Sequence, residues 1–206
     1  IHAAEGLGVN LLDTARSYGD PDGHSEEVIG RAVHDRRDRY VIASKFRPIT
    51  DDPDEIRARE WVFKACDGSL GRMRTDYIDV YQLHAVPHES TMPAVMDALA
   101  DLKVQGKVRW FGISNNDVGV IRKLLALGDI SVLQVGYNLL SRSGEDALKL
   151  ARAENLGVLV RVPLARGVLT GKYFHSMGQL DAGDERWGNF TSKDMTASLK
   201  KLSKLL

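Results

Sequence analysis

Cysteine is nearly absent from this sequence of 206 residues, because Cys66 is the only one. A single cysteine excludes an internal disulfide and a cysteine-rich metal site, and it is typical of a reducing compartment. Cys66 lies within a helical pattern, which predicts that it packs in the core. The six histidines lack the paired spacing of a zinc site, so no metal is expected.

An excess of charge of either sign is also lacking, since Lys+Arg and Asp+Glu both number 28. Without a net field, neither nucleic acid nor an acidic membrane surface is an expected partner. No apolar run approaches the roughly 20 residues of a membrane span, and the first residues do not resemble a signal peptide. We expect a cytoplasmic protein with one domain over residues 1–206, of which 43% are hydrophobic.

Three familiar motifs are missing as well. The chain has no Gly-x-Gly-x-x-Gly, so a Rossmann dinucleotide site has no support, and it has no Gly-x-Ser-x-Gly hydrolase turn. Residues 167–173 resemble a phosphate-binding P-loop but have one residue too few between the glycines. With these motifs absent, the candidate functional residues are those at the ends of the predicted strands.

What the sequence has is a regular alternation of apolar segments and helical patterns. Strands are predicted at residues 9–13, 40–46, 76–84, 108–115, 132–138 and 157–164, with helices between them. Residues 1–8 resemble the last turns of a helix, Ser25 is the expected N-cap of the helix at 25–33, and a last amphipathic helix is expected at 195–206. Strict alternation implies right-handed crossovers and a parallel α/β sheet.

Both an (α/β) barrel and a doubly wound sheet fit this alternation. Polar residues follow nearly every strand, whereas an open sheet concentrates its site at one switch point. We therefore predict a TIM (β/α)8 barrel that is incomplete, with about six of its eight parallel strands. The polar residues at the strand ends are Asp13, Lys45, His84, Ser114, Asn115 and Gln134.

Four candidate catalytic residues lie at or just beyond the carboxyl ends of the first three predicted strands: Asp13, Tyr18, Lys45 and His84. Singly, each has an ordinary explanation, such as a turn cap, a solvated lysine or a structural histidine. In a barrel they converge on one mouth, where Asp13 would hold Lys45 and the Lys45 ammonium would make Tyr18 a better acid. His84 would orient a substrate oxygen. This combination predicts protonation of a carbonyl oxygen as hydride arrives.

The residues around these positions resemble the aldo-keto reductase family. The resemblance runs in order from residue 1 to about residue 190 and implies a TIM-barrel carbonyl reductase that uses NADPH, with the four residues as its catalytic tetrad and a small carbonyl compound as substrate. The motifs that carry it include Asp13-Thr14-Ala15-x-x-Tyr18-Gly19, Ser25-Glu26-Glu27-x-Ile29-Gly30, Ser44-Lys45-Phe46, Tyr81-Gln82-Leu83-His84, Gly112-Ile113-Ser114-Asn115, Tyr137-Asn138-Leu139-Leu140 and Pro163-Leu164-Ala165-Arg166-Gly167.

The resemblance also implies a cofactor site. Ser114, Asn115 and Gln134 would hydrogen-bond the nicotinamide carboxamide. Arg161 stands where many members have the aromatic residue that stacks on the nicotinamide, so a guanidinium plane would take that place and add positive charge. The loop that would wrap the pyrophosphate supplies the remaining expected contacts, Pro163, Leu164, Ala165, Arg166 and Gly167.

Two tryptophans have different expected places. Trp187 lies in the long loop after the sixth predicted strand and is a candidate for either the substrate wall or loop packing. Trp110 lies on the fourth predicted strand and is expected in the core or the barrel wall.

The family has one strand before residue 1 and another strand with a helix after residue 206, and these two strands are neighbours in the closed barrel. We expect a fragment of a full-length reductase; a shortened homologue whose edges pair with another chain is the alternative. The part beyond residue 206 would carry the basic residues that hold the 2′-phosphate of NADPH.

These observations predict an oxidoreductase that reduces aldehydes or ketones to alcohols, with hydride from NADPH and a proton from Tyr18. One alternative is a non-catalytic regulatory subunit that binds a nicotinamide nucleotide, or an inactive fragment of a reductase. Another is a Schiff-base aldolase that uses Lys45. The sequence identifies neither the individual substrate nor the oligomeric state.

Overall fold

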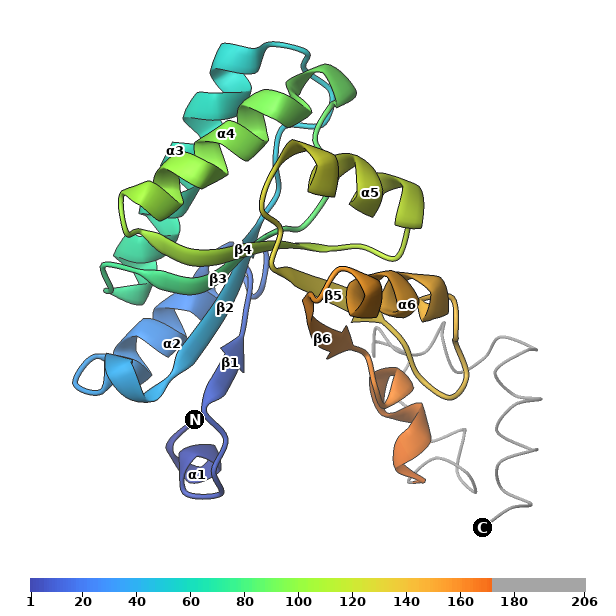
Figure 1. Cartoon of the computed structure of the whole chain (residues 1–206). Coiled ribbons are helices and arrows are strands. Elements are labelled where there is room, and N and C mark those ends of the chain that lie inside the picture. The colour runs from blue at the N-terminus through green and yellow to red at the C-terminus, as the bar shows by residue number, and fades with distance from the viewer. Residues whose placement is uncertain (172–206) are drawn as a thin grey trace.

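The computed structural model of the chain describes residues 1–171, in which six parallel strands form one sheet (Figure 1). The strands pair in their sequence order, β1 to β6, without a crossover that skips a neighbour. Sequential parallel pairing is the order of a barrel and not of a doubly wound sheet, as the sequence predicts. The strands are β1 (Leu11–Asp13), β2 (Val41–Phe46), β3 (Ile78–Leu83), β4 (Val108–Ser114), β5 (Val132–Gly136) and β6 (Gly157–Arg161).

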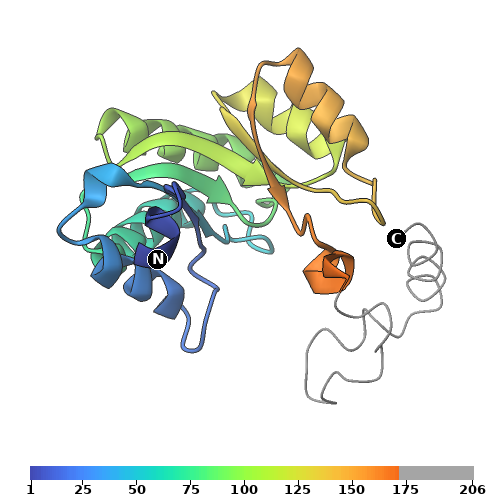
Figure 2. The same ribbon diagram turned by 90° about the horizontal axis from the view of Figure 1, so that it is seen from below.

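Helices connect the strands and form an outer layer. Each helix from α2 to α6 contacts the next one along the chain, and Figure 2 shows the curl of the sheet with α5 and α6 outside β5 and β6. Within the described residues, no helix has both the length and the apolar content to cross a membrane. The helices are α1 (His2–Glu5), α2 (His24–Val33), α3 (Glu55–Met73), α4 (Met92–Val104), α5 (Val118–Leu127) and α6 (Glu145–Ala153), with short 3-10 helices at Arg37–Arg39, Glu89–Thr91 and Ala165–Thr170.

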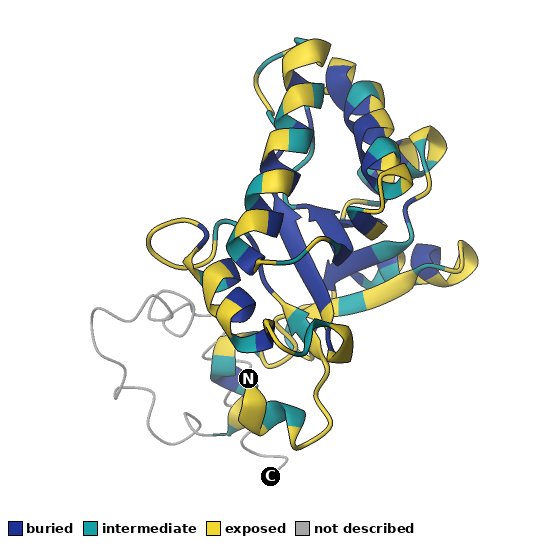
Figure 3. Ribbon diagram, turned by 90° about the vertical axis from the view of Figure 1, so that its left-hand side faces the viewer, coloured by how far each residue is buried: buried dark blue, intermediate teal, exposed yellow. Residues whose placement is uncertain are grey.

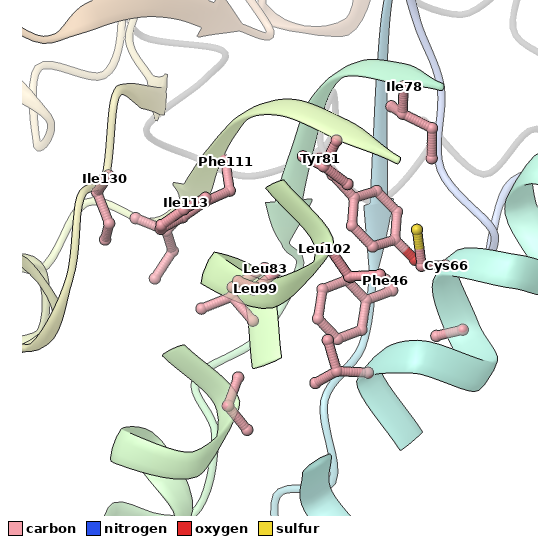
Figure 4. Close-up of a cluster of buried hydrophobic side chains, with 14 of the residues drawn as sticks. Phe46, Cys66, Ile78, Tyr81, Leu83, Leu99, Leu102, Phe111, Ile113 and Ile130 are labelled. Atoms are coloured by element: carbon pink, nitrogen blue, oxygen red, sulfur yellow. The ribbon is translucent and has the colours of Figure 1, made fainter. Parts of the chain in front are cut away.

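The hydrophobic core lies between the sheet and the helices. Figure 3 shows buried strands beneath helices that turn their exposed residues outward. Phe46 and Tyr81 stack with ring centroids 4.8 Å apart, and Cys66 lies in the same cluster (Figure 4). Burial raises the pKa of the Cys66 thiol to about 12, so this cysteine is a packing residue, as predicted.

Helix starts follow local hydrogen bonding, with one correction to the sequence prediction. Asp54 caps α3 by accepting from the Arg57 backbone N–H at 3.0 Å. Ser25, predicted as the N-cap of α2, lies inside that helix. Gly23 occupies the cap position because the chain enters the helix with φ +91°, a left-handed conformation suited to glycine. The Ser25 hydroxyl instead accepts from Thr14 Oγ1 at 2.8 Å.

Further outcomes concern strand lengths and Trp110. β1 begins at Leu11, because Val9 lies outside the ladder and is exposed. β6 ends at Arg161, because Val162 adopts φ +52°, a left-handed conformation that cannot be part of an extended strand. Trp110 lies on β4 and is 51% exposed, so of its two expected places, the core and the barrel wall, it occupies the wall. Trp187 and the predicted helix at 195–206 lie outside the described residues.

Candidate active site

A buried lysine is the centre of the candidate site at the carboxyl ends of the first strands. Lys45 Nζ donates to both carboxylate oxygens of Asp13, at 2.8 and 2.9 Å, and to the Thr14 carbonyl oxygen at 2.7 Å. The Lys45 side chain is fully buried, whereas that of Asp13 is 36% exposed. These three acceptors satisfy all three N–H donors of an ammonium group, so the buried Lys45 Nζ has a hydrogen-bond partner in each direction.

Strand alternation explains why Lys45 points to this side of the sheet. Phe46 packs in the core beneath the helices, and the Ser44 hydroxyl donates to the buried Glu26 carboxylate of α2 at 2.5 Å. Since successive side chains of a strand point to opposite faces, Lys45 faces away from the helices. Backbone pairing continues past the strand ends, where Arg16 N donates to Lys45 O at 3.1 Å and draws the Tyr18 loop against β2.

Tyr18 and His84 lie on the solvent side of Lys45. The Tyr18 ring centroid is 5.0 Å from Lys45 Nζ, and the rings of Tyr18 and His84 meet edge-on with centroids 5.7 Å apart. Tyr18 is 38% exposed, so a small molecule at the mouth reaches its ring. The structure therefore brings all four predicted catalytic residues together.

The electrostatic environment of His84 favours a neutral imidazole. Burial lowers its pKa first, followed by the positive charges of Lys45, Arg47 and Arg161, with Asp13 opposing them. His84 Nδ1 lies 3.3 Å from Ser17 Oγ. A neutral ring with one nitrogen held by Ser17 leaves Nε2 for a substrate oxygen.

The three polar residues predicted to hold the nicotinamide lie at the ends of β4 and β5. Ser114 and Gln134 are register partners, and Gln134 Nε2 donates to Asp13 Oδ1 at 2.9 Å. Gln134 therefore belongs to the same polar cluster as Asp13 and Lys45. Asn115 Oδ1 accepts from the Asp117 backbone N–H at 2.8 Å, which occupies part of its amide in the turn that leads into α5.

The loop after β6 forms a separate cavity of about 200 Å³. Three of the predicted cofactor contacts line it, namely Arg161, Ala165 and Arg166, whereas Pro163, Leu164 and Gly167 do not. Two residues of its wall have left-handed backbone conformations that are uncommon for residues other than glycine, since φ is +49° at Ala165 and +55° at Arg166. The Arg161 guanidinium lies against Gly136, where a Cβ atom would come within 3.2 Å of Arg161 Cζ.

Sequence reasoning missed two polar residues of this region. Asn138 shapes the cavity because its Oδ1 accepts from the backbone of Leu140 and Ser141 at 2.9 Å, while its Nδ2 donates to Val162 O at 3.1 Å. Gln82 is fully buried, and its amide has no hydrogen-bond partner among residues 1–171. Strand alternation from His84 could have placed Gln82 on the face of the sheet that carries the site.

Sequentially paired parallel strands, with ionic and aromatic side chains gathered at their carboxyl ends, form the architecture of a (β/α)8 barrel. The chain belongs to the aldo/keto reductase family, whose family model matches residues 1–205. The family resemblance and the incomplete barrel predicted from the sequence are thus confirmed.

Two similar proteins are longer than this chain. An aldo-keto reductase of Bacillus subtilis, YhdN, is 31% identical to this chain, and the match covers all of this chain and 64% of YhdN. The uncharacterized oxidoreductase YqkF of the same organism is 34% identical, and the match covers 81% of this chain and 55% of YqkF. The chain therefore spans just over half to about two thirds of these relatives.

Solved structures show the same fold. A Klebsiella pneumoniae aldo/keto reductase in complex with NADP and acetate has a TM-score of 0.70 at 32% identity, over 84% of this chain and 59% of that one. The glycerol dehydrogenase AKR11B4 of Gluconobacter oxydans has a TM-score of 0.80 at 30% identity, over 99% of this chain and 65% of that one.

Proposed function

We propose that this site reduces an aldehyde or ketone to an alcohol with NADP(H) as the hydride donor. The observation that carries the proposal is the buried Lys45 ammonium, held by Asp13 and Thr14 at 2.7–2.9 Å, with the Tyr18 ring 5.0 Å away. A charge fixed in this way stabilises a neighbouring group that gains negative charge during a reaction.

Tyr18 is the proton donor in this proposal. When its hydroxyl gives a proton to the carbonyl oxygen, the phenolate left behind is stabilised by the adjacent ammonium. Asp13 holds Lys45 in place, and Gln134 fixes the carboxylate from the other side of the mouth. The charge is therefore already oriented before the substrate arrives, which lowers the cost of reorganisation.

His84 orients the substrate oxygen toward Tyr18. Its lowered pKa keeps the imidazole neutral near pH 7, so Nε2 can donate a hydrogen bond to the carbonyl without carrying a competing charge. Ser17 restrains the ring through Nδ1. Together with Tyr18, the histidine defines one position for the oxygen atom, and this places the carbonyl carbon for hydride.

The residues after β6 fit a dinucleotide. The 200 Å³ cavity presents the Arg161 and Arg166 side chains beside a turn with left-handed backbone, a combination suited to pyrophosphate oxygens. We assign the pyrophosphate to the loop formed by Pro163, Leu164, Ala165, Arg166 and Gly167, and the carboxamide to Ser114, Asn115 and Gln134. When bound, the nicotinamide supplies the hydride. The Klebsiella pneumoniae neighbour, crystallised with NADP, supports this assignment.

The contacts of Lys45 argue against the aldolase alternative. A Schiff base requires a neutral amine with a free lone pair, but all three positions of Lys45 Nζ donate to oxygen acceptors. The regulatory alternative, a nucleotide-binding subunit without turnover, differs from the reductase in activity alone.

The test is oxidation of NADPH, followed by its absorbance, with a panel of small aldehydes and ketones. The 206-residue chain should turn over at least one of them, and Tyr18→Phe should reduce kcat by about 10²-fold or more while NADPH still binds. A wild-type chain that binds NADPH without turnover would support the regulatory alternative. Equal turnover by Tyr18→Phe would exclude Tyr18 as the proton donor.

A further inference from the structure

A second cavity, of about 160 Å³, opens beside the four catalytic residues. Lys45 and Ser17 form the part of its wall that it shares with the catalytic cluster. The rest of the wall comes from residues that the proposed proton transfer does not use, namely Arg16, Asp22, Arg47 and Trp61. Their chemistry bears on which carbonyl compounds enter the mouth.

Trp61 of α3 positions both arginines. Its ring centroid lies 4.9 Å from Arg16 Cζ, a cation–π distance. Its indole Nε1 donates to the Arg47 carbonyl oxygen at 2.8 Å. One rigid aromatic side chain thus supports the guanidinium of Arg16 and fixes the backbone of Arg47 at the end of β2.

The two guanidinium groups have no assigned partner in the part of the chain that the structure describes. Neither Arg16 nor Arg47 forms a side-chain hydrogen bond or an ion pair there, whereas Arg72, which lines the adjoining cavity, pairs with Glu26. A guanidinium offers five N–H donors in a planar fork that matches a carboxylate or a phosphate. Two such groups on one cavity wall therefore offer several donors to a single anion.

The charge balance of the cavity is positive. Asp13 neutralises Lys45, which leaves two guanidinium groups against the Asp22 carboxylate, and Asp22 forms no ion pair within the described residues. The positive field extends to the reacting groups. Burial and then the charges of Lys45 and Arg47 lower the pKa of His84. A substrate anion in this cavity would lie next to the site of carbonyl protonation.

We propose that Arg16 and Arg47 form an anion-recognition subsite, and that the substrates are small aldehydes or ketones bearing a carboxylate or a phosphate. This inference rests on the reductase function proposed above. The anionic group occupies the cavity beside Trp61, and the carbonyl group reaches Tyr18 and His84. The Asp22 carboxylate faces the same anion and weakens its binding, because like charges repel.

Turnover of matched substrates tests the subsite. The ratio of kcat/KM for succinic semialdehyde over butanal, or for glyceraldehyde 3-phosphate over glyceraldehyde, should be about tenfold or more in the wild-type chain. The pair with the larger ratio identifies the preferred anion. R16Q and R47Q should each lower that ratio several-fold, and D22N should raise it. R122Q, which removes an exposed arginine of α5, is the control and should leave the ratio within twofold. Ratios near one in the wild type, or equal ratios in R16Q, R47Q and wild type, would overturn the proposal.

A binding measurement separates failure of the subsite from failure of the proposed function. The Trp61 indole resonance, assigned with W61F, is followed during titration with sodium succinate or sodium phosphate, and sodium chloride at equal ionic strength is the reference. A saturable shift in wild type that disappears in the R16Q/R47Q double variant supports the subsite even if no aldehyde is turned over. A shift no larger than that with chloride overturns it.

Discussion

The histidine at the mouth shows how single residues set the chemistry of the site. His84 lies directly after β3, half-buried, and the cations around it outweigh the one carboxylate. Since its pKa lies below the ordinary value near 6.5, the folded chain binds a proton on this ring less readily than the unfolded chain does. The free energy of unfolding therefore decreases as the pH falls from above 6.5 through the lowered pKa of His84.

We expect the imidazole resonances of His84 to titrate with a midpoint below about 6.5, the value of a free histidine. Replacing Arg47 by Gln removes one of the charges that lower the pKa, so the midpoint should move upward in that variant. Histidine NMR spectra recorded across the pH range, with His84→Gln for assignment, measure both values. A wild-type midpoint at or above that of a free histidine would contradict the environment described here.

Residue types together with their positions at successive strand ends predicted that Asp13, Tyr18, Lys45 and His84 lie at one mouth, and the structure brings them together. Their catalytic roles stay a prediction. The contact between Gln134 and Asp13 could not be predicted in the same way. It joins side chains 121 positions apart in the sequence and depends on how far the sheet curls between β1 and β5. The exact curvature is a property of packing and is not contained in any short motif.

Among the helices, α2 and α3 make a close contact. A Cβ atom at Gly30 of α2 would come within 2.6 Å of the Arg72 carbonyl oxygen, which is backbone and cannot move aside cheaply. Beside this contact, Arg72 Nε donates to the buried Glu26 carboxylate at 2.8 Å. The two helices thus depend on glycine for their approach and on an ion pair for their register.

Gly30→Ala should lower the free energy of unfolding by about 1–3 kcal/mol through overpacking. Gly71→Ala is the matched control, because Gly71 is also helical but has open space at the Cβ position. Alanine there should raise the free energy of unfolding by about 0.5–1 kcal/mol, since it has the higher helix propensity. Urea unfolding of the two variants provides the comparison, and equal effects would mean that the helix contact is not tight.

The periodic pattern predicted the order and type of every described strand and of helices α2–α6, because alternation and helical spacing are local properties. Helix starts were less predictable. Ser25 had the right residue type for an N-cap, but the left-handed conformation of Gly23 starts the helix two residues earlier. The true ends of β1 and β6 depend on neighbouring chain segments, which the sequence of a single strand does not describe.

At the scale of the whole molecule, the two ends of the sheet have different roles. The carboxyl ends hold the candidate catalytic residues, whereas the amino ends carry an ionic network around the buried Asp79 of β3. Asp79 accepts from Arg37 at 2.6 Å, from Arg109 at 2.9 Å and from the Ile42 backbone N–H at 2.9 Å. This network connects β2, β3 and β4 at the end of the barrel that serves stability.

Asp79→Asn should lower the free energy of unfolding by about 3 kcal/mol, because it leaves the largely buried Arg37 guanidinium without its counter-charge. Asp67→Asn is the control, since its ion pair with Lys107 is on the surface and is worth less than about 1 kcal/mol. Thermal or urea unfolding distinguishes the two. A similar loss in both variants would show that the network around Asp79 contributes no more than a surface pair.

A working nicotinamide site at the carboxyl ends of this sheet must bind the reduced dinucleotide. We would titrate the purified 206-residue chain with NADPH and follow the quenching of its tryptophan fluorescence. We predict saturable quenching that persists in Tyr18→Phe and weakens several-fold in Arg166→Gln, which loses the guanidinium group of the loop assigned to the pyrophosphate. Folded wild-type protein whose fluorescence shows no saturable response to NADPH would mean that these residues do not form such a site.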